Sequence, residues 1–216
     1  RIVCLFREGP LAGEGREKGI PFTCLNLPYR WGLRTLLGIR DWIRSNPMDI
    51  LHTYLFGFHL FAGLPARLLK VPRVLSSRRD VDTGQRHRDL WIERLGNLFV
   101  DRVVCCAKAA ERWVLEKEKI RPEKVATLYN GVDLNRFRPV KDHREVRRKV
   151  GIPEEVPVVG TIANFAAPKK GYPYLLDAVR EILKRRPSVW FLLVGSGPQE
   201  KEIREKAKEI PGHERI

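Results

Sequence analysis

Short apolar runs rich in Val and Ile alternate along the chain with longer stretches in which apolar residues recur every three or four positions. The apolar runs predict β-strands, and the amphipathic stretches predict helices. The expected strands are residues 2–6, 22–25, 49–53, 73–76, 102–106, 125–129, 156–163 and 189–194. The expected helices are residues 31–45, 55–69, 88–99, 108–117, 172–186 and 199–209. Strands that are apolar on both faces and are each followed by a helix indicate parallel sheets covered on both sides, so the expected class is α/β.

This alternation breaks between Asn130 and Pro157. Asn130-Gly131 is a turn dipeptide, Pro139 interrupts regular structure, and residues 141–148 are highly charged. The alternation of strands and helices then restarts. We interpret the break as the link between two domains.

We therefore expect two doubly wound, Rossmann-like domains, residues 1–140 and residues 141–216. The second domain supplies only two strands and two helices, which are too few to cover both faces of a parallel sheet. Residues 213–216 resemble the start of a further strand. We expect the second domain to be incomplete within these 216 residues.

The charge balance is strongly basic, with 41 Lys and Arg against 26 Asp and Glu and a formal net charge of +15. A basic surface attracts phosphates of any kind, whether of nucleic acid, anionic lipid or nucleotide diphosphates. The pairs Arg78-Arg79 and Arg185-Arg186 lack interleaved aromatic residues, which argues against a nucleic-acid groove. The longest apolar stretch, residues 54–64, is too short to span a bilayer.

The four cysteines, Cys4, Cys24, Cys105 and Cys106, lack the spacing of a metal site. Cys4 and the Cys105-Cys106 pair lie in strand-like runs, where thiols usually serve as small buried hydrophobic groups. This usage is typical of a reducing cytosol.

Two segments combine glycine or asparagine with a preceding strand. Residues 129–139 read Asn-Gly-Val-Asp followed by an aromatic residue and Pro, which taken alone is only a turn. Residues 192–198 end a strand with Gly195-Ser196-Gly197-Pro198. Such glycines let the chain approach a ligand closely, although a plain strand-to-helix turn has the same pattern.

A third segment, residues 158–171, runs from a strand through a loop to a helix N-terminus and ends in Lys170-Gly171. A helix N-terminus offers unpaired backbone N–H groups and a positive dipole to a phosphate. A lysine just before the helix adds a full positive charge there. The structural alternative is a solvated pair of lysines at a helix start.

In this order, the three segments resemble the signature of retaining glycosyltransferases of family 4, which have the two-domain GT-B fold. The resemblance covers nearly the whole chain. It implies that Lys170 and Gly171 bind the donor's diphosphate, together with Gly195 and Gly197 of the later loop. Asn164 stands at the position where the family has an arginine, so half of the cationic clamp is missing or is replaced by a neutral donor.

The resemblance also covers the N-terminal half. Residues 48–53 resemble the family's Asp-Ile-Val-His strand, which places His52 at the carboxyl end of a parallel strand, where open α/β sheets bind ligands. Arg78 falls where many members have a histidine near the reacting sugar. A guanidinium stays protonated and cannot act as a base, but it could bind a phosphate or neutralise an acidic acceptor. His52 and Arg78 are thus the catalytic candidates, and Asn130 and Gly131 form the expected interdomain hinge.

The implied function is transfer of a sugar from a nucleotide diphosphate sugar to a glycan or lipid-linked acceptor of the cell envelope, with retention of configuration. The resemblance implies no cofactor and no metal. The expected partners are the nucleotide-sugar donor and the acceptor, and nucleic acid is not expected to bind. The expected location is the cytoplasm. Contact with an anionic membrane, for which Trp31 is an aromatic candidate, is a further hypothesis. The family's first Gly-rich loop and its Glu-x7-Glu motif are not found among these residues.

Two other classes remain open. One is a non-catalytic basic α/β module that binds anionic lipid or nucleic acid. The other is an isomerase or phosphorylase with the same two-domain fold, because a shared fold does not fix the reaction.

Overall fold

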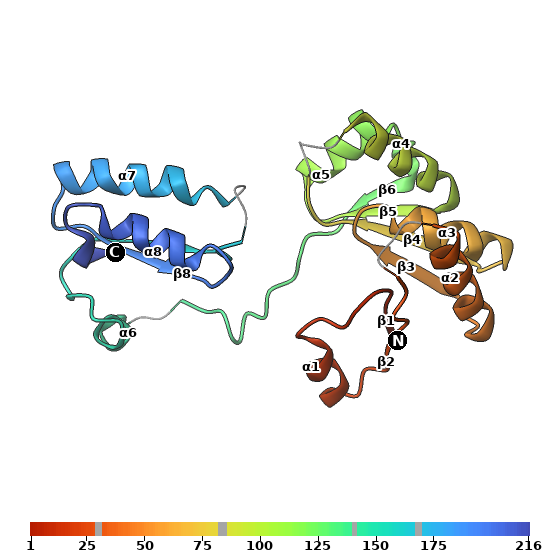
Figure 1. The fold of residues 1–216 in the computed structure, drawn as a ribbon, viewed down its shortest axis with the longest axis horizontal. Coiled ribbons are helices and arrows are strands. Elements are labelled where there is room, and N and C mark those ends of the chain that lie inside the picture. Colours follow the sequence, from red (N-terminus) through yellow and green to blue (C-terminus); the bar gives the residue numbers. More distant parts are fainter. Residues whose placement is uncertain (29–31, 82–85, 140–141, 167–169) are drawn as a thin grey trace. The chain divides into compact units, whose positions relative to one another are not determined.

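The computed structural model describes residues 1–28, 32–81, 86–139, 142–166 and 170–216. The chain folds into two compact units, unit 1 (Arg1–Val132) and unit 2 (Asp133–Ile216) (Figure 1). The expected boundary lies eight residues further along, after residue 140. Trp31 lies outside the described residues.

Unit 1 alternates strands and helices. Its strands are β1 (Ile2–Cys4), β2 (Phe22–Cys24), β3 (Ile50–Tyr54), β4 (Arg73–Arg78), β5 (Arg102–Cys105) and β6 (Val125–Thr127). Its helices are α1 (Ala12–Glu17), α2 (Leu33–Ser45), α3 (Phe58–Leu68), α4 (His87–Gly96) and α5 (Lys108–Trp113). Short turns of 3₁₀-helix, η1 (Asn97–Phe99) and η3 (Pro122–Lys124), and of π-helix, η2 (Val114–Glu118), complete it.

All strand pairs of unit 1 are parallel, but they form two sheets among the described residues. One sheet has the order β3-β4-β5-β6, and the other pairs β1 with β2. The edges of β1 and β3 face a cavity of about 890 Å³ lined by residues of both strands. In a doubly wound sheet of order 3-2-1-4-5-6, the first strand lies in the middle of the sheet. The cavity lined by β1 and β3 corresponds to that central position.

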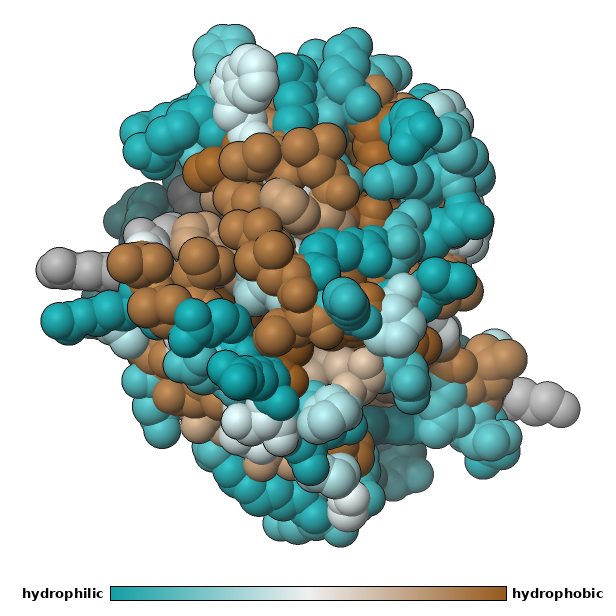
Figure 2. Space-filling model, turned by 90° about the vertical axis from the view of Figure 1, so that its right-hand side faces the viewer, coloured by the Kyte–Doolittle hydropathy of each residue, from teal (hydrophilic) through white to brown (hydrophobic). Residues whose placement is uncertain are grey.

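The core of unit 1 lies between the four-stranded sheet and its helices. Val74 and Val103 of the central strands are fully buried, as are Ala66 of α3 and Val114 of η2. Burial of both faces explains why the strands read as nearly continuous apolar runs. Figure 2 turns unit 1 toward the viewer and shows a hydrophobic area bordered by hydrophilic residues.

Unit 2 contains α6 (Arg144–Lys149), β7 (Val158–Ile162), α7 (Tyr172–Arg185), β8 (Trp190–Val194), α8 (Glu200–Lys208) and η5 (His213–Arg215). β7 and β8 pair in parallel, with Val158 opposite Trp190. The amphipathic face expected of residues 172–186 is confirmed, since Leu176, Val179 and Leu183 are buried. Ile162 of β7 is 84% exposed, so this two-stranded sheet is not covered on both faces.

The α/β class is confirmed, but some expected elements are wrong. Residues 213–216 do not begin a strand; His213–Arg215 form the 3₁₀-helix η5 after Gly212, which has a φ of +86°. The charged stretch in the expected linker includes helix α6. Helix α3 begins at Phe58 rather than Leu55, because Leu55 and Gly57 both have left-handed φ values of +73°.

Candidate functional site

His52 lies near the carboxyl end of β3, next to β4. Its Nε2 is 2.8 Å from Oγ of Ser77, and the Tyr54 hydroxyl is 3.3 Å from its Nδ1. The rings of His52 and Tyr54 also stack, with centroids 4.4 Å apart. Partial burial, and then the positive charge of Arg79, lower the pKa of His52. A half-buried, neutral imidazole is therefore held by two hydroxyl groups at the edge of the sheet where ligands bind in open α/β folds.

Arg78, at the end of β4, is almost fully buried and is bound by the protein. Its Nε and Nη2 donate to the two carboxylate oxygens of Glu118 at 2.9 and 2.8 Å. Nη1 donates to Oγ of Ser76 at 2.6 Å, and Nη2 donates to Oδ1 of Asn97 at 3.0 Å. The guanidinium is thus occupied by protein acceptors, and its side chain is only 10% exposed. This geometry fits a residue that positions the edge of the sheet.

A second buried carboxylate, Glu93, lies beside the same guanidinium. Its Oε2 is 2.7 Å from Nη2 of Arg78, and its Oε1 accepts a 2.9 Å hydrogen bond from the backbone N–H of Gly57. Burial raises the pKa of Glu93 to about 7, against the opposing effect of Arg78 and with a further increase from Glu118. Two carboxyl groups therefore share one buried cation, and Glu93 is only partly ionised near neutral pH.

His59 completes this cluster and is fully buried. Its Nε2 lies 3.1 Å from the carbonyl oxygen of Glu93. Burial, and then the charge of Arg78, lower its pKa to about 4, so this imidazole is neutral at physiological pH. A Cβ atom at Gly96 would overlap the ring, which explains the glycine at that position of α4. We refer to Arg78, Glu93, Glu118, His59 and Asn97 as the Arg78 cluster.

A cavity of about 210 Å³ opens above this cluster at the same edge of the sheet. Arg78, Glu93 and Glu118 line it together with Leu55, Phe56 and Trp113. Arg79 and Asp80, the next residues of the chain, also line it and are exposed. The cavity thus combines an exposed cation with apolar walls.

The sequence contains one Asp-x-Asp pair, Asp80-Val81-Asp82, a spacing that can hold a divalent cation. Asp82 lies outside the described residues. Within the ranges that the structure describes, no group of three His, Cys, Asp or Glu side chains is placed to hold a metal ion. The expectation of a metal-independent site stays a prediction.

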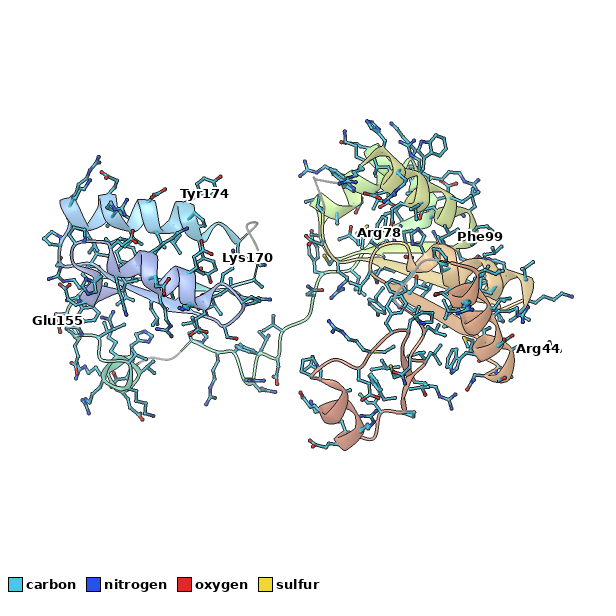
Figure 3. All side chains as sticks on the ribbon, in the orientation of Figure 1. Arg44, Arg78, Phe99, Glu155, Lys170 and Tyr174 are labelled. Atoms are coloured by element: carbon cyan, nitrogen blue, oxygen red, sulfur yellow. The ribbon has the colours of Figure 1, made fainter. Side chains whose placement is uncertain are left out.

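In unit 2, the loop from β7 to α7 leads to the N-terminus of α7. Gly171 is the N-cap of α7 with a φ of +71°, and no side chain among the described residues caps the helix there or places an acidic group in its first turn. Lys170 precedes it and is exposed, as is Asn164; Figure 3 shows Lys170 at this end of α7 (Figure 3). By contrast, α8 has Glu200 and Glu202 in its first turn. The positive end of α7 is thus free of an acidic side chain, whereas that of α8 has two. Pro168 and Lys169 lie outside the described residues.

Gly195 and Gly197 have a structural reason to be glycine. A Cβ atom at Gly195 would overlap the carbonyl oxygen of Ala163, and one at Gly197 would overlap the backbone of Phe165. Backbone hydrogen bonds join the two loops, from Phe165 N–H to the Ser196 carbonyl at 2.9 Å and from Gln199 N–H to the Phe165 carbonyl at 2.8 Å. The glycines thus hold the β7–α7 loop against the β8–α8 loop, and their contact with a donor stays a prediction.

Asn130 and Gly131 are exposed and lie just before the boundary between the units. Neither has a positive φ, so the sharp reversal expected from this dipeptide is not present. The turn lies further along, where Phe137 N–H donates to the Asp133 carbonyl at 2.8 Å and Oδ1 of Asp133 accepts from Asn135 N–H at 2.9 Å. The role of the dipeptide as a hinge stays a prediction.

The sequence interpretation missed Ser77, Tyr54 and the carboxylates around Arg78. One signal was available: Glu93 and Asn97 are spaced by four within an expected helix, so two polar side chains share one face. Such a face is ordinarily assigned to solvent, and only the position of Arg78 shows that it is buried.

Comparisons with known proteins agree with this arrangement of two α/β units. The sequence profile named Glycosyltransferase Family 4 matches residues 1–136. The chain belongs to glycosyltransferase family 4. A second profile, Glycosyl transferases group 1, matches residues 142–215. The family assignment expected from the three segments is confirmed.

This family 4 chain is similar to curated enzymes with lipid-containing acceptors in their names. It is 22% identical over 190 residues to the UDP-Gal:alpha-D-GlcNAc-diphosphoundecaprenol alpha-1,3-galactosyltransferase of Escherichia coli, covering 82% of this chain and 48% of that enzyme. It is 25% identical over 207 residues to the phosphatidyl-myo-inositol mannosyltransferase of Mycolicibacterium smegmatis, covering 94% and 50%. The chain thus spans about half the length of these relatives.

Solved structures share the fold of the family 4 chain. Anabaena HepE in complex with UDP-glucose matches with a TM-score of 0.79 at 20% identity, covering 100% of this chain and 59% of that one. A glycosyltransferase from Rickettsia africae matches with a TM-score of 0.75 at 18% identity, covering 99% and 58%. Among the described residues of this chain, no helix has the length and apolar character needed to span a membrane.

Proposed function

We propose that this chain is part of a glycosyltransferase that transfers a sugar from a nucleotide diphosphate sugar to a lipid-linked or glycan acceptor, with retention of configuration. The observation that carries the proposal is the free N-terminus of α7, with Lys170 before it and Gly171 at its cap. The E. coli relative is named for UDP-galactose as donor, and both it and the mycobacterial relative are named for lipid acceptors, which supports the same classes here.

The chemistry of sugar transfer explains why a cation is needed at a helix N-terminus. The diphosphate leaves as negative charge grows on it, while the anomeric carbon becomes oxocarbenium-like. Fixed positive groups placed at the leaving group lower the energy of that transition state. In the proposed scheme the Lys170 ammonium and the first amides of α7 bind the diphosphate, and the Asn164 amide adds a neutral hydrogen bond.

In unit 1, the edge formed by β3 and β4 is the proposed acceptor side. His52, held by Ser77 and Tyr54, presents a half-buried imidazole there. Arg79, the exposed residue directly after β4, could pair with an acceptor phosphate. Arg78 is proposed to position this edge through Glu118 rather than to contact the substrate.

Nucleotide binding tests the donor site without requiring turnover. Isothermal titration of the 216-residue chain with UDP, GDP and ADP should show binding of one of them. Lys170→Ala should weaken that binding about 10- to 100-fold, the effect of one charge-assisted hydrogen bond of about 1.5–3 kcal/mol. The matched control is Lys184→Ala, which removes the same charge at the opposite end of α7, where Lys184 pairs with Glu181. Equal affinities for both variants would refute the assignment of Lys170.

Activity is tested in the protein that contains this chain together with any residues on either side of it. Labelled UDP-galactose and GDP-mannose serve as donors, with polyprenyl-diphosphate sugar or phosphatidylinositol as acceptor. The anomeric configuration of the product, measured by NMR, decides between retention and inversion. A modified nucleotide sugar without transfer would indicate an isomerase, an alternative favoured by the match to a UDP-N-acetylglucosamine 2-epimerase with a TM-score of 0.55.

A further inference from the structure

Cys4 and Cys24 face each other at the carboxyl ends of two neighbouring strands. Each is the last residue of its strand, and the parallel register of β1 and β2 places Cys4 directly opposite Cys24. Figure 1 shows the two strands side by side (Figure 1). Residues opposite each other in a parallel pair direct their side chains to the same face of the sheet, so both thiols leave the same face.

The spacing of the two strands suits a disulfide. Adjacent strands lie about 4.8 Å apart, and cysteines joined by a disulfide have Cα atoms about 4.4–6.8 Å apart. The strands are also held together next to the pair, because the Leu25 N–H donates to the Cys4 carbonyl at 2.9 Å and the Leu27 N–H donates to the Leu5 carbonyl at 2.8 Å. A bond between the two sulfur atoms therefore requires no change of register.

The two thiols are free and only partly buried. The Cys24 thiol donates to Oδ1 of Asn26 at 3.2 Å. Burial, then the nearby Cys24, and then Glu8 raise the pKa of Cys4. The effect of Cys24 requires the two groups to be close enough to interact electrostatically. A small oxidant can thus reach two neighbouring thiols.

The other two cysteines are placed differently. Cys105 of β5 is fully buried, and Cys106 follows it in sequence. Successive residues of an extended chain direct their side chains to opposite faces, so these two thiols are not presented side by side. Cys106 is partly exposed. It therefore provides a single accessible thiol in the same unit with which the Cys4–Cys24 pair can be compared.

We propose that Cys4 and Cys24 form a reversible disulfide that ties β1 to β2, with a small disulfide such as oxidised glutathione as the oxidant. One protein thiolate attacks a sulfur atom of the oxidant and releases one glutathione. The second protein thiolate attacks the protein sulfur of this mixed disulfide, forms the Cys4–Cys24 bond and releases the other glutathione. The two electrons and two protons lost by the protein thiols end on the two glutathione molecules. The proposal goes beyond sugar transfer and does not depend on it.

The disulfide acts on a part of unit 1 that has little pairing of its own. β1 and β2 contribute three residues each and, among the described residues, pair only with each other. A sheet of two strands is only marginally stable. A cross-link that closes the loop of residues 5–23 lowers the entropy of the opened segment. Oxidation therefore favours the paired state of β1 and β2 over the opened one.

Mass spectrometry of the oxidised chain tests the proposal. The 216-residue chain is incubated with oxidised glutathione and digested without reductant. A pair of peptides joined through Cys4 and Cys24 should appear, lighter than the two free peptides by two hydrogen atoms, and dithiothreitol should separate it. The ratio of this linked pair to the glutathione adducts of the same cysteines should be at least about tenfold higher in buffer than in concentrated urea. The reason is that the folded register holds the thiols together, whereas a flexible loop supplies only a millimolar effective concentration.

Single substitutions identify the two partners. Cys4→Ser and Cys24→Ser should each abolish the linked pair and leave glutathione on the remaining cysteine, because the second thiolate is missing. Cys106→Ser is the matched control and should form the linked pair as the parent does. Circular dichroism checks that the variants are folded, and the comparison of buffer with urea needs no variant.

Hydrogen exchange measures the effect on the strands. The amides of Leu25 and Leu27 bond across β1 and β2, and oxidation should slow their exchange at least about tenfold. The Ala163 amide donates to the Val194 carbonyl in unit 2 and should exchange at the same rate before and after oxidation.

Three results would overturn the proposal. The folded chain could carry glutathione adducts without any linked pair, or the ratio of linked pair to adducts could be the same in buffer and in urea. Alternatively, the Leu25 and Leu27 amides could exchange equally fast in the reduced and the oxidised chain, in which case the bond does not tie β1 to β2.

Discussion

Glu93 should make the stability of unit 1 depend on pH in a way that one substitution removes. In the folded protein the pKa of this carboxyl rises from 4.5 to about 7, chiefly because the group is buried. In the unfolded chain it ionises near its ordinary pKa. As the pH rises from about 4.5 to about 7, the unfolded state therefore loses a proton that the folded state keeps, and unfolding becomes more favourable.

The size of this effect follows from the two pKa values. A difference of about 2.5 corresponds to a loss of about 3 kcal/mol, complete once the pH exceeds about 7. Glu93→Gln has no proton to lose, so its stability should not show this decline. The variant need not be more stable at every pH, because an amide next to the guanidinium of Arg78 lacks the carboxylate's charge.

Urea unfolding followed by tryptophan fluorescence at pH 5, 6, 7 and 8 measures the effect. The quantity to compare is the difference in unfolding free energy between the parent and Glu93→Gln at each pH. That difference should shift in favour of the variant by about 2–3 kcal/mol between pH 5 and pH 8. Glu116→Gln, at an exposed position of η2, is the control and should parallel the parent. If the unfolding free energies of the parent and of Glu93→Gln changed in parallel with pH, the raised pKa of Glu93 in the folded protein would be refuted.

Three further outcomes follow from the packing. Gly195→Ala should lower the free energy of unfolding of unit 2 by about 3 kcal/mol, the upper part of the range for overpacking, because the new Cβ meets a backbone carbonyl that cannot move alone. Urea unfolding measures this. A shift of the urea midpoint smaller than that caused by a surface substitution would contradict the prediction. Gly96→Ala should lower the stability of unit 1 by a similar amount, because the new Cβ overlaps the buried imidazole of His59. Gly131→Ala, with open space around the new Cβ, should leave the thermal melting temperature nearly unchanged. Burial raises the pKa of Cys105 to about 11, so this thiol should react with a disulfide reagent at pH 8 only after urea unfolding; mass spectrometry of the labelled peptide at low urea checks it.

Local pattern alone predicted most of the regular elements. The spacing of Leu176, Val179 and Leu183 identified α7 and the face that it buries, because a single apolar stripe has one possible orientation toward a core. The strands were also found, since Val and Ile runs buried on both faces have no other common explanation. The separation into two sheets was not predicted, because pairing between β1 and β3 depends on what lies between them.

The candidate site divides in the same way. Lys170 and Gly171 could be predicted because a helix N-terminus and a preceding cation are adjacent in sequence. The surroundings of Arg78 could not, because Glu118 is 40 residues away in sequence, beyond β5 and α5, and only the tertiary fold brings it to Arg78. The role of Gly195 was ambiguous for a related reason: close approach by a ligand and close approach by the chain's own backbone select the same residue.

Helix α4 shows why the orientation of a helix can depend on a residue elsewhere in the chain. The sequence predicted a helix over residues 88–99, and the structure has α4 and η1 there. Trp91, Leu95 and Leu98 form an apolar stripe along one side, so pattern alone would have buried that side. The guanidinium of Arg78 reverses the choice, because a buried cation must be paired, and Glu93 of α4 and Asn97 of η1, on the opposite side from the apolar stripe, provide the pairing. The apolar stripe is thus exposed as a direct consequence of burying one arginine, and the cluster and the stripe are two faces of one helix.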